Sequence, residues 1–139
     1  MPGLSQEEAQ RLFGELFAPW VQDLRLTVEE VGDGAATLRM PFDQRLTRIG
    51  GTVCGQALMA LADTAMVFVI SGAFGAFKPM TTVNQSTQFM RAIANADVLA
   101  EGRILRLGRT MAFGEVRLRA EGDPAPAVHV SSAYAILPG

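Results

Sequence analysis

Cysteine and histidine are almost absent from this sequence, which holds one of each in 139 residues, Cys54 and His129. A lone cysteine excludes an internal disulfide framework, and the pair is too few for a thiolate–imidazole metal cluster. We therefore expect no bound metal and a reduced, cytoplasmic setting. Nothing in the sequence indicates a redox cofactor.

An excess of charge of one sign is also missing, because 12 basic and 14 acidic residues give a net charge of −2. This balance argues against a protein held to nucleic acid by bulk charge. Five arginines gather in the segment 103–119 with Phe113 as their one aromatic neighbour, too few rings for a stacking platform. We expect no nucleic-acid partner.

The first residues lack the basic start and apolar stretch of a secretory signal.

One long hydrophobic run is present, Val53–Phe77, and its length of about 25 residues is enough to cross a bilayer. Asp63 lies near its middle, where an ionised group is costly in lipid. Basic residues do not cluster at either end of the run, as they do beside cytoplasmic ends of membrane spans. The run therefore predicts a buried helix that ends near residues 72–78, and no membrane partner.

The remaining pattern predicts one domain, 1–139. Ser5 and Glu8 form a capping-box pair ahead of an apolar stripe, which predicts a helix over 5–17. Six strands are predicted at about 25–31, 35–42, 81–91, 97–107, 110–120 and 127–136. Strands in unbroken succession favour antiparallel pairing, and an apolar helix must be covered on most sides. The fold class is therefore α+β, an antiparallel sheet wrapped around one long central helix.

Asp63 is the most informative residue, because apolar residues flank it on both sides. Burial tends to raise a carboxyl pKa, and proteins seldom bury an ionisable group without pairing it or using it. Either a strand arginine or a backbone amide pairs with Asp63 and its role is structural, or Asp63 is a functional acid. Gln56, two turns earlier, points in nearly the same direction, and Met59, Met66 and Ile70 fall on that side. A few polar groups among apolar ones are typical of a pocket wall.

The start of this helix is a second candidate site. Gly55 lies in the first turn, where backbone N–H groups lack acceptors and can hold an anion or polarise a carbonyl oxygen. Alternatively, Gly50, Gly51 and Gly55 only permit a tight turn. Gly55 and Asp63 are about 12 Å apart along a helix, so one helix cannot present both to the same carbonyl. If they cooperate, two copies of the chain must share the site as a homodimer.

Around these residues the sequence resembles the hotdog-fold acyl-CoA thioesterases, in particular the branch like phenylacetyl-CoA thioesterases. That family carries Gly-x-x-His-Gly-Gly followed by a helix with Leu-x-Asp, and the segment Gly51–Ala65 takes its place. Phe89–Arg91 is similar to the family's Phe-Leu-Arg segment, and Gly102–Ala120 to its long fourth and fifth strands.

The resemblance implies a homodimer or homotetramer that hydrolyses a medium-chain or aromatic acyl-CoA to the free acid and coenzyme A. Asp63 would be the nucleophile or general base, and Gly55 of the other protomer the oxyanion donor. Thr82 aligns with a hydroxyl that orients water in relatives. Strand alternation groups Thr82 with the polar residues 84, 86 and 88.

Three positions depart from the family's pattern: Cys54 replaces its histidine, Gln56 its second glycine and Arg48 a frequent asparagine. Gln56 would return an amide donor to the catalytic group, and Arg48 would bind a substrate carboxylate or phosphate unless it is simply a loop arginine. The residues expected to contact the substrate and its coenzyme A are Arg48, Cys54, Met59, Arg91, Arg106, Gly108 and Arg109.

Three other functions stay open. A protein of this fold that binds acyl-CoA without turnover would share every binding residue. Cys54 could be a nucleophile with His129 as its base, because a helix N-terminus lowers a thiol pKa. Hydratases and dehydratases of the same fold use a histidine–acid pair, but no histidine lies near Asp63 in the sequence.

Overall fold

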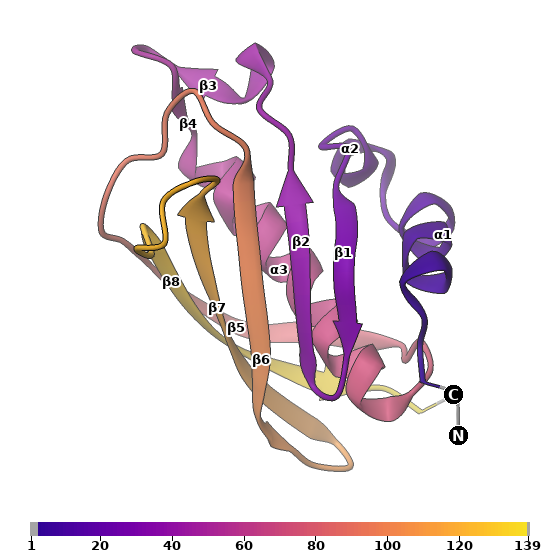
Figure 1. Cartoon of the computed structure of the whole chain (residues 1–139). Helices are drawn as coiled ribbons and strands as arrows, with labels where there is room; N and C mark the ends of the chain where they lie inside the picture. The colour runs from indigo at the N-terminus through magenta and orange to yellow at the C-terminus, as the bar shows by residue number, and fades with distance from the viewer. Residues whose placement is uncertain (1–2, 139) are drawn as a thin grey trace.

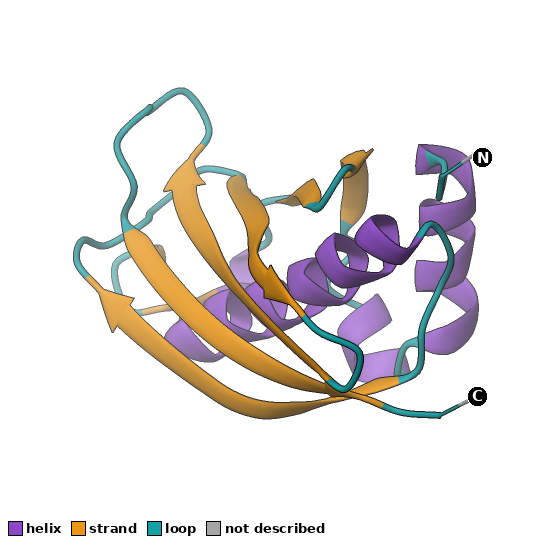
Figure 2. Ribbon diagram, turned by 90° about the horizontal axis from the view of Figure 1, so that it is seen from below, coloured by secondary structure: helices purple, strands orange, loops and turns teal. Residues whose placement is uncertain are grey.

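A six-stranded antiparallel sheet curves around one long helix, α3, in the computed structural model of the protein, which describes residues 3–138. Figure 2 shows the sheet cupping α3, and in Figure 1 the helix α1 lies beside the edge strand β1. The elements are α1 (Gln6–Leu16), α2 (Pro19–Gln22), β1 (Thr27–Gly32), β2 (Ala35–Met40), a 3-10 turn (Gln44–Leu46), β3 (Thr47–Arg48), β4 (Thr52–Val53), α3 (Gly55–Phe74), β5 (Met80–Phe89), β6 (Val98–Leu107), β7 (Met111–Ala120) and β8 (Val128–Ile136).

The expected architecture is confirmed, and the six long strands lie within two residues of their predicted bounds. The strand order is β1-β2-β6-β7-β8-β5. The consecutive pairs β1–β2, β6–β7 and β7–β8 are hydrogen-bonded neighbours, and two connections interrupt this succession. Through α3 the chain passes from β2 to β5 at the far edge of the sheet, and after β5 it crosses back to β6 beside β2. The short elements α2, β3 and β4 lie in segments for which no helix or strand was predicted, because two to four residues carry no periodicity.

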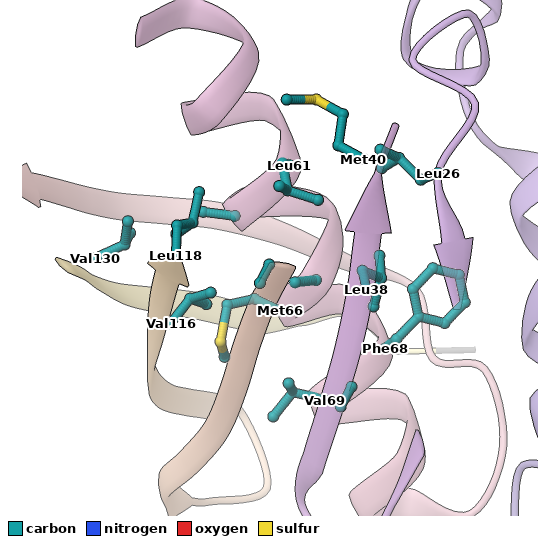
Figure 3. Close-up of a cluster of buried hydrophobic side chains, with 14 of the residues drawn as sticks. Leu26, Leu38, Met40, Leu61, Met66, Phe68, Val69, Val116, Leu118 and Val130 are labelled. Carbon is teal, nitrogen blue, oxygen red and sulfur yellow. The ribbon is translucent and has the colours of Figure 1, made fainter. Parts of the chain in front are cut away.

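Close packing of α3 on the sheet forms the core. A Cβ on Gly114 would overlap the Met66 side chain and lie 2.9 Å from the carbonyl oxygen of Arg103. A Cβ on Gly102 would lie 2.8 Å from Cγ2 of Val69. The two glycines thus let the helix approach the strands. The buried side chains that meet there include Leu38, Leu61, Met66, Phe68, Val69, Val116, Leu118 and Val130 (Figure 3).

The two halves of α3 differ in how far they are covered. Phe68–Gly72 are all buried, so the fold encloses this part of the C-terminal half on every side. Met66 and Ile70 are fully buried too, and their predicted place on a pocket wall beside Asp63 is wrong. Met66 turns toward the sheet, and Ile70 belongs to the enclosed half. By length and composition α3 could span a membrane, but 67% of its most apolar stretch is buried within the fold.

One edge of the sheet is covered by a helix and the other is not. The predicted capping box is confirmed, since Ser5 Oγ accepts the Glu8 N–H at 3.1 Å, and it starts α1 beside β1. Gln10 of α1 then bonds the chain leading into β1: its Nε2 donates to the Leu26 carbonyl at 3.1 Å, and its Oε1 accepts the Val28 N–H at 2.8 Å. At the opposite edge, none of the described residues pairs with the outer backbone of β5.

Gly114→Ala should destabilise the fold by about 1–3 kcal/mol, because the added Cβ meets both a side chain and a backbone carbonyl. Gly14→Ala is the matched control, since Gly14 lies in α1 with open space around its Cβ position. That change should stabilise the protein by about 0.5–1 kcal/mol. Urea unfolding measures both free energies, and equal stabilities of wild type and Gly114→Ala would contradict the close packing of α3.

Candidate active site

Asp63 lies on the uncovered side of α3 and not inside the core. It is half-buried, on a stripe that also holds Gln56, Met59, Ala60 and Val67. Asp63 is therefore less buried than its apolar neighbours in the sequence suggested, because those neighbours turn toward the sheet. Asp63 is nevertheless the one charged residue that the sequence of α3 contains.

Two hydroxyl groups hold one oxygen of this carboxylate. Thr82, on β5, donates its Oγ1 hydroxyl to Oδ1 of Asp63 at 2.9 Å. Tyr134, on β8, donates its hydroxyl to the same oxygen at 2.5 Å. Among residues 3–138, no guanidinium pairs with Asp63, so the alternative in which a strand arginine neutralises it is wrong for this part of the chain. Oδ2 has no donor among the same residues.

The carboxylate opens into a mostly apolar cavity of about 200 Å³. Its walls come from α3, from β5, and from the end of α1 and the helix α2, which follow one another in the chain. Trp20 is 60% exposed and stands between this cavity and the next one. The lining side chains are Phe17, Trp20, Val21, Ala60, Asp63, Thr64, Val67, Met80, Thr82 and Tyr134.

A bulge in β5 aims Thr82 at Asp63. The pairing with β8 shifts register between Thr82 and Asn84, so Thr82 lies opposite Tyr134 while Asn84 lies opposite Ala133. Tyr134 faces α3, and a single register slip moves side chains to the other face of a sheet. Thr82 therefore does not share a face with residues 84, 86 and 88, as alternation predicted, and the extra residue, Val83, is the cause.

Gly55 is the first residue of α3 and lines a different cavity, of about 350 Å³. Its N–H has no acceptor among the described residues, as expected at a helix start. A Cβ at this position would lie 3.2 Å from Cζ of Phe89, so glycine leaves the ring its space. Arg48 and Arg91 line the same cavity. The structure thus brings together three of the predicted residues, Gly55, Arg48 and Arg91, without Asp63.

Cys54 and Gln56 line a third cavity, of about 270 Å³, together with Trp20. Cys54 is the N-cap residue of α3, and its side chain makes no capping hydrogen bond. Gln56 therefore points the same way as Asp63 but opens into a neighbouring cavity. Met59 lies between them on the helix, 39% exposed, and its carbonyl oxygen accepts the Gln85 side-chain amide at 3.2 Å.

The remaining predicted residues, Arg106, Gly108 and Arg109, belong to the hairpin between β6 and β7. Gly108 closes this turn by donating its N–H to the Met111 carbonyl at 2.8 Å. In Figure 1 the hairpin lies at the end of the sheet opposite β4, after which α3 begins. Within one protomer the structure does not bring these residues to the Gly55 cavity.

Cys54 and His129 do not form a catalytic pair in the protomer. His129 faces the outer side of the sheet, where its Nε2 lies 2.9 Å from Oε1 of Glu115. The His129 ring, and then the Arg103 guanidinium, hold the pKa of the Glu115 carboxyl below its usual range. Cys54 opens into the cavity beside Trp20, on the helix side of the sheet. The nucleophile–base alternative is therefore wrong within one protomer.

The family model of the thioesterase superfamily matches residues 50–127, which hold the whole of α3 with Asp63 and the strands β5, β6 and β7. The chain belongs to the thioesterase superfamily. A candidate esterase of Halobacterium salinarum is 30% identical over 111 residues, which are 75% of this chain and 72% of that protein. A candidate esterase of Thermoplasma acidophilum is 25% identical over 97 residues, 70% of this chain and 73% of that protein.

Solved structures agree with this membership. A candidate thioesterase from a Silicibacter strain is 31% identical, with a TM-score of 0.88 over 99% of this chain and 95% of that one. Zebra fish thioesterase superfamily member 2 is 21% identical, with a TM-score of 0.85 over 97% and 100% of the two chains, and shows the shared fold. The hotdog fold expected for this thioesterase superfamily chain is confirmed.

In this thioesterase superfamily chain, the two groups that could act on a carbonyl lie at separate places on α3. A carboxylate with one oxygen free of donors can accept a proton or attack a carbonyl carbon, and a free N–H at a helix start can hold an oxyanion. Here the carboxylate is Asp63 and the N–H is that of Gly55. They open into separate cavities, about 12 Å apart along α3.

Tyr134 is the residue at this site that the sequence analysis missed. It is the one tyrosine in the sequence and is 1% exposed. Burial, and next the charge and hydrogen bond of Asp63, raise the pKa of Tyr134 far above its usual value. The alternation of β8 places Val128, Val130 and Ser132 on the same inward face, and a tyrosine on that face needs a partner for its hydroxyl.

Tyr134 should therefore keep its proton in alkaline solution for as long as the protein stays folded. A folded state that holds this proton more tightly is stabilised below the ordinary tyrosine pKa of about 10 and loses that stability as the pH rises above it. Because the sequence has one tyrosine and the indole of its one tryptophan does not ionise, the pH-dependent absorption of tyrosinate follows this group alone. The urea-unfolded chain is the control and should titrate near pH 10. Tyrosinate formation near that pH in the folded protein would contradict the burial of Tyr134.

Proposed function

We propose that the protein is an acyl-CoA thioesterase that works as a homodimer, or as a tetramer of two such dimers. In each site Asp63 of one protomer acts on the thioester or on water, and Gly55 of the partner subunit donates its N–H to the carbonyl oxygen. Family membership supports the hydrolysis of a thioester. The separation of Gly55 and Asp63 along α3 is the observation that supports a dimer, because one helix cannot place both groups on one carbonyl.

Uncovered surface in the protomer supports a second copy. The edge of β5 is free in the described chain, and Val83 at its bulge is 58% exposed. Phe89 and Met90 at its end are about half exposed as well. An exposed edge strand with large apolar side chains is a surface that proteins normally pair or cover. β5 and the uncovered stripe of α3 are adjacent, joined by the Gln85 amide and the Met59 carbonyl.

The walls of the Asp63 cavity support an apolar acyl group. Phe17 and Trp20 contribute rings, and Val67 and Met80 contribute aliphatic side chains. The volume of about 200 Å³ compares with the roughly 150 Å³ of an engineered apolar cavity that binds benzene. An aromatic ring or a short to medium alkyl chain is therefore the group we assign to this cavity.

Arg48 and Arg91 support binding of the coenzyme A phosphates at the Gly55 end. Both line the cavity into which the Gly55 N–H opens. Arg91 already donates to Asp123 at 3.3 Å and to the Ala125 carbonyl at 3.0 Å, which fixes its guanidinium near the rim. Arg106 and Arg109 can contribute only from another protomer whose β6–β7 hairpin approaches this rim.

The reaction then balances without a cofactor. As general base, Asp63 takes a proton from water, the oxygen of that water attacks the thioester carbonyl, and the partner's Gly55 N–H holds the oxyanion. Collapse of the tetrahedral intermediate breaks the C–S bond, and the sulfur leaves with the proton that Asp63 took up. If Asp63 is instead the nucleophile, its oxygen forms a mixed anhydride, which water hydrolyses in a second step.

Asp63→Asn should lower kcat/KM for thiol release by about 10²–10⁴-fold, because it removes a positioned base and keeps the side-chain shape. The substrates are acetyl-, hexanoyl-, decanoyl- and phenylacetyl-CoA, among which the hexanoyl and phenylacetyl esters should react fastest. Asp33→Asn, in the exposed turn between β1 and β2, is the matched acid-to-amide control and should leave the rate unchanged.

Two outcomes would count against this function. Release that survives Asp63→Asn would remove Asp63 from the mechanism. If the wild type releases no thiol from any of the esters but coenzyme A raises its melting temperature, the protein is a binding protein without turnover.

Gly55→Pro tests the shared site, because proline at the first helical position removes the N–H and fits a helix start. Cys54, with φ −70° and ψ 150°, already has the backbone conformation that a following proline requires. Gly55→Ala adds a Cβ but keeps the N–H, so comparing it with Gly55→Pro isolates the effect of the N–H. We expect the proline variant to lose about 10²–10³ in kcat relative to the alanine variant.

Co-expression of Gly55→Pro with Asp63→Asn separates a shared site from one within a single chain. Each mixed dimer holds one site with both groups intact, so activity should return to about a quarter of the wild-type rate when the two chains mix at random. Each variant alone should stay inactive. Failure of the mixture to recover activity, with mixed dimers isolated by two affinity tags, would contradict the shared site.

A further inference from the structure

The two oxygens of the Asp63 carboxylate differ in their hydrogen bonds. Oδ1 accepts hydrogen bonds from Thr82 at 2.9 Å and from Tyr134 at 2.5 Å, while Oδ2 has no donor among the described residues. The Tyr134 hydroxyl also lies 3.3 Å from the backbone carbonyl of Asp63. One hydroxyl therefore contacts the main chain and the side chain of the same residue, which fixes the carboxylate relative to the turn of α3 that carries it.

We propose that Tyr134, together with Thr82, positions Asp63 by holding Oδ1, and that Oδ2 is therefore the oxygen that takes the proton or attacks the carbonyl. This inference rests on the proposed function. A carboxylate oxygen with two donors has its lone pairs occupied and its charge stabilised, which makes it a poorer base than its unbound twin. Tyr134 is a positioning residue, because it is only 1% exposed at the wall of the Asp63 cavity and its hydroxyl donates to Oδ1 of Asp63.

The two donors differ in how firmly they are held. Tyr134 lies on the inward face of β8, in the middle of the sheet, and its ring is enclosed. Thr82 lies on the edge strand β5 and is exposed. Burial raises the pKa of Tyr134, so its hydroxyl stays a donor throughout the working pH range. Tyr134 should therefore contribute more to the orientation of Asp63 than Thr82 does.

Few other ionisable groups face the Asp63 carboxylate in the described chain. The sequences of α2 and β5 contain no charged residue, and α3 has Asp63 alone. His129 of β8 lies on the outer face with Glu115, and Asp23, which ends α2, lines the neighbouring cavity. A loss of kcat on substitution of Tyr134 can thus be traced to Asp63 rather than to another charged group of these elements.

Tyr134→Phe tests the role of the hydroxyl and keeps the ring. We expect kcat to fall by about tenfold to a hundredfold with KM little changed, since a hydrogen bond to a charged group is lost away from the substrate. In an Asp63→Asn background, Tyr134→Phe should cause no further loss.

Two further variants bracket this result. Thr82→Val removes the other donor from an exposed position, should lower kcat by a smaller factor, and keeps the test open if Tyr134→Phe folds poorly. Ser131→Ala removes a hydroxyl from the outer face of β8, the strand that carries Tyr134, and should behave as wild type. A purely structural Tyr134 would instead lower the melting temperature and leave the kcat of the folded protein unchanged.

The outcomes separate this inference from the proposed function. If the wild type hydrolyses acyl-CoA and Asp63→Asn does not, but Tyr134→Phe keeps the wild-type kcat, the role of Tyr134 is overturned and the thioesterase stands. If the wild type hydrolyses no acyl-CoA, both are overturned as catalytic statements. The hydrogen bond itself has its own readout, because Asp63→Asn should shift the near-ultraviolet spectrum of the one tyrosine.

Discussion

The packing of α3 against the sheet decides where every other group of the site can lie. Gly102 and Gly114 remove the side chains that would keep the helix away, and Val69 and Met66 occupy the space they leave. This contact fixes the rotation of the helix. Because neighbouring residues on a helix differ by about 100° in direction, a rotation by one residue would turn Asp63 away from the cavity. The core and the candidate site therefore depend on the same contact.

The hydrogen bonds at Asp63 join three segments that are distant in the sequence. Asp63 comes from α3, Thr82 from the edge strand β5 and Tyr134 from the interior strand β8. Both donors are neutral. An arginine in their place would have neutralised the carboxylate and drawn it into a structural ion pair, whereas two hydroxyls hold it and leave its charge available. This difference favours a chemical role for Asp63 over a structural one.

Much of this arrangement could be predicted from the sequence, and the parts that could not have physical causes. Asp63 could be selected because it is the one charge in a long apolar helix. The face of Thr82 could not, since Val83 looks like an ordinary strand residue and a bulge leaves no compositional mark. Tyr134 left a usable signal, its inward position in the alternation of β8. The hairpin 106–109 could be predicted as a turn, but its distance from Gly55 depends on strand pairing.

The exchange of the family's histidine for Cys54 concerns only one end of the proposed site. Cys54 lies beside Gln56 and Trp20, and none of the hydrogen bonds of the Asp63 carboxylate involves it. In a shared site the residue next to the oxyanion donor is the partner's Cys54. The exchange therefore changes the surroundings of the carbonyl oxygen and leaves the hydrogen bonds of Asp63 as they are. In the proposed site it affects the polarisation of the thioester, while Thr82 and Tyr134 hold the carboxylate in place.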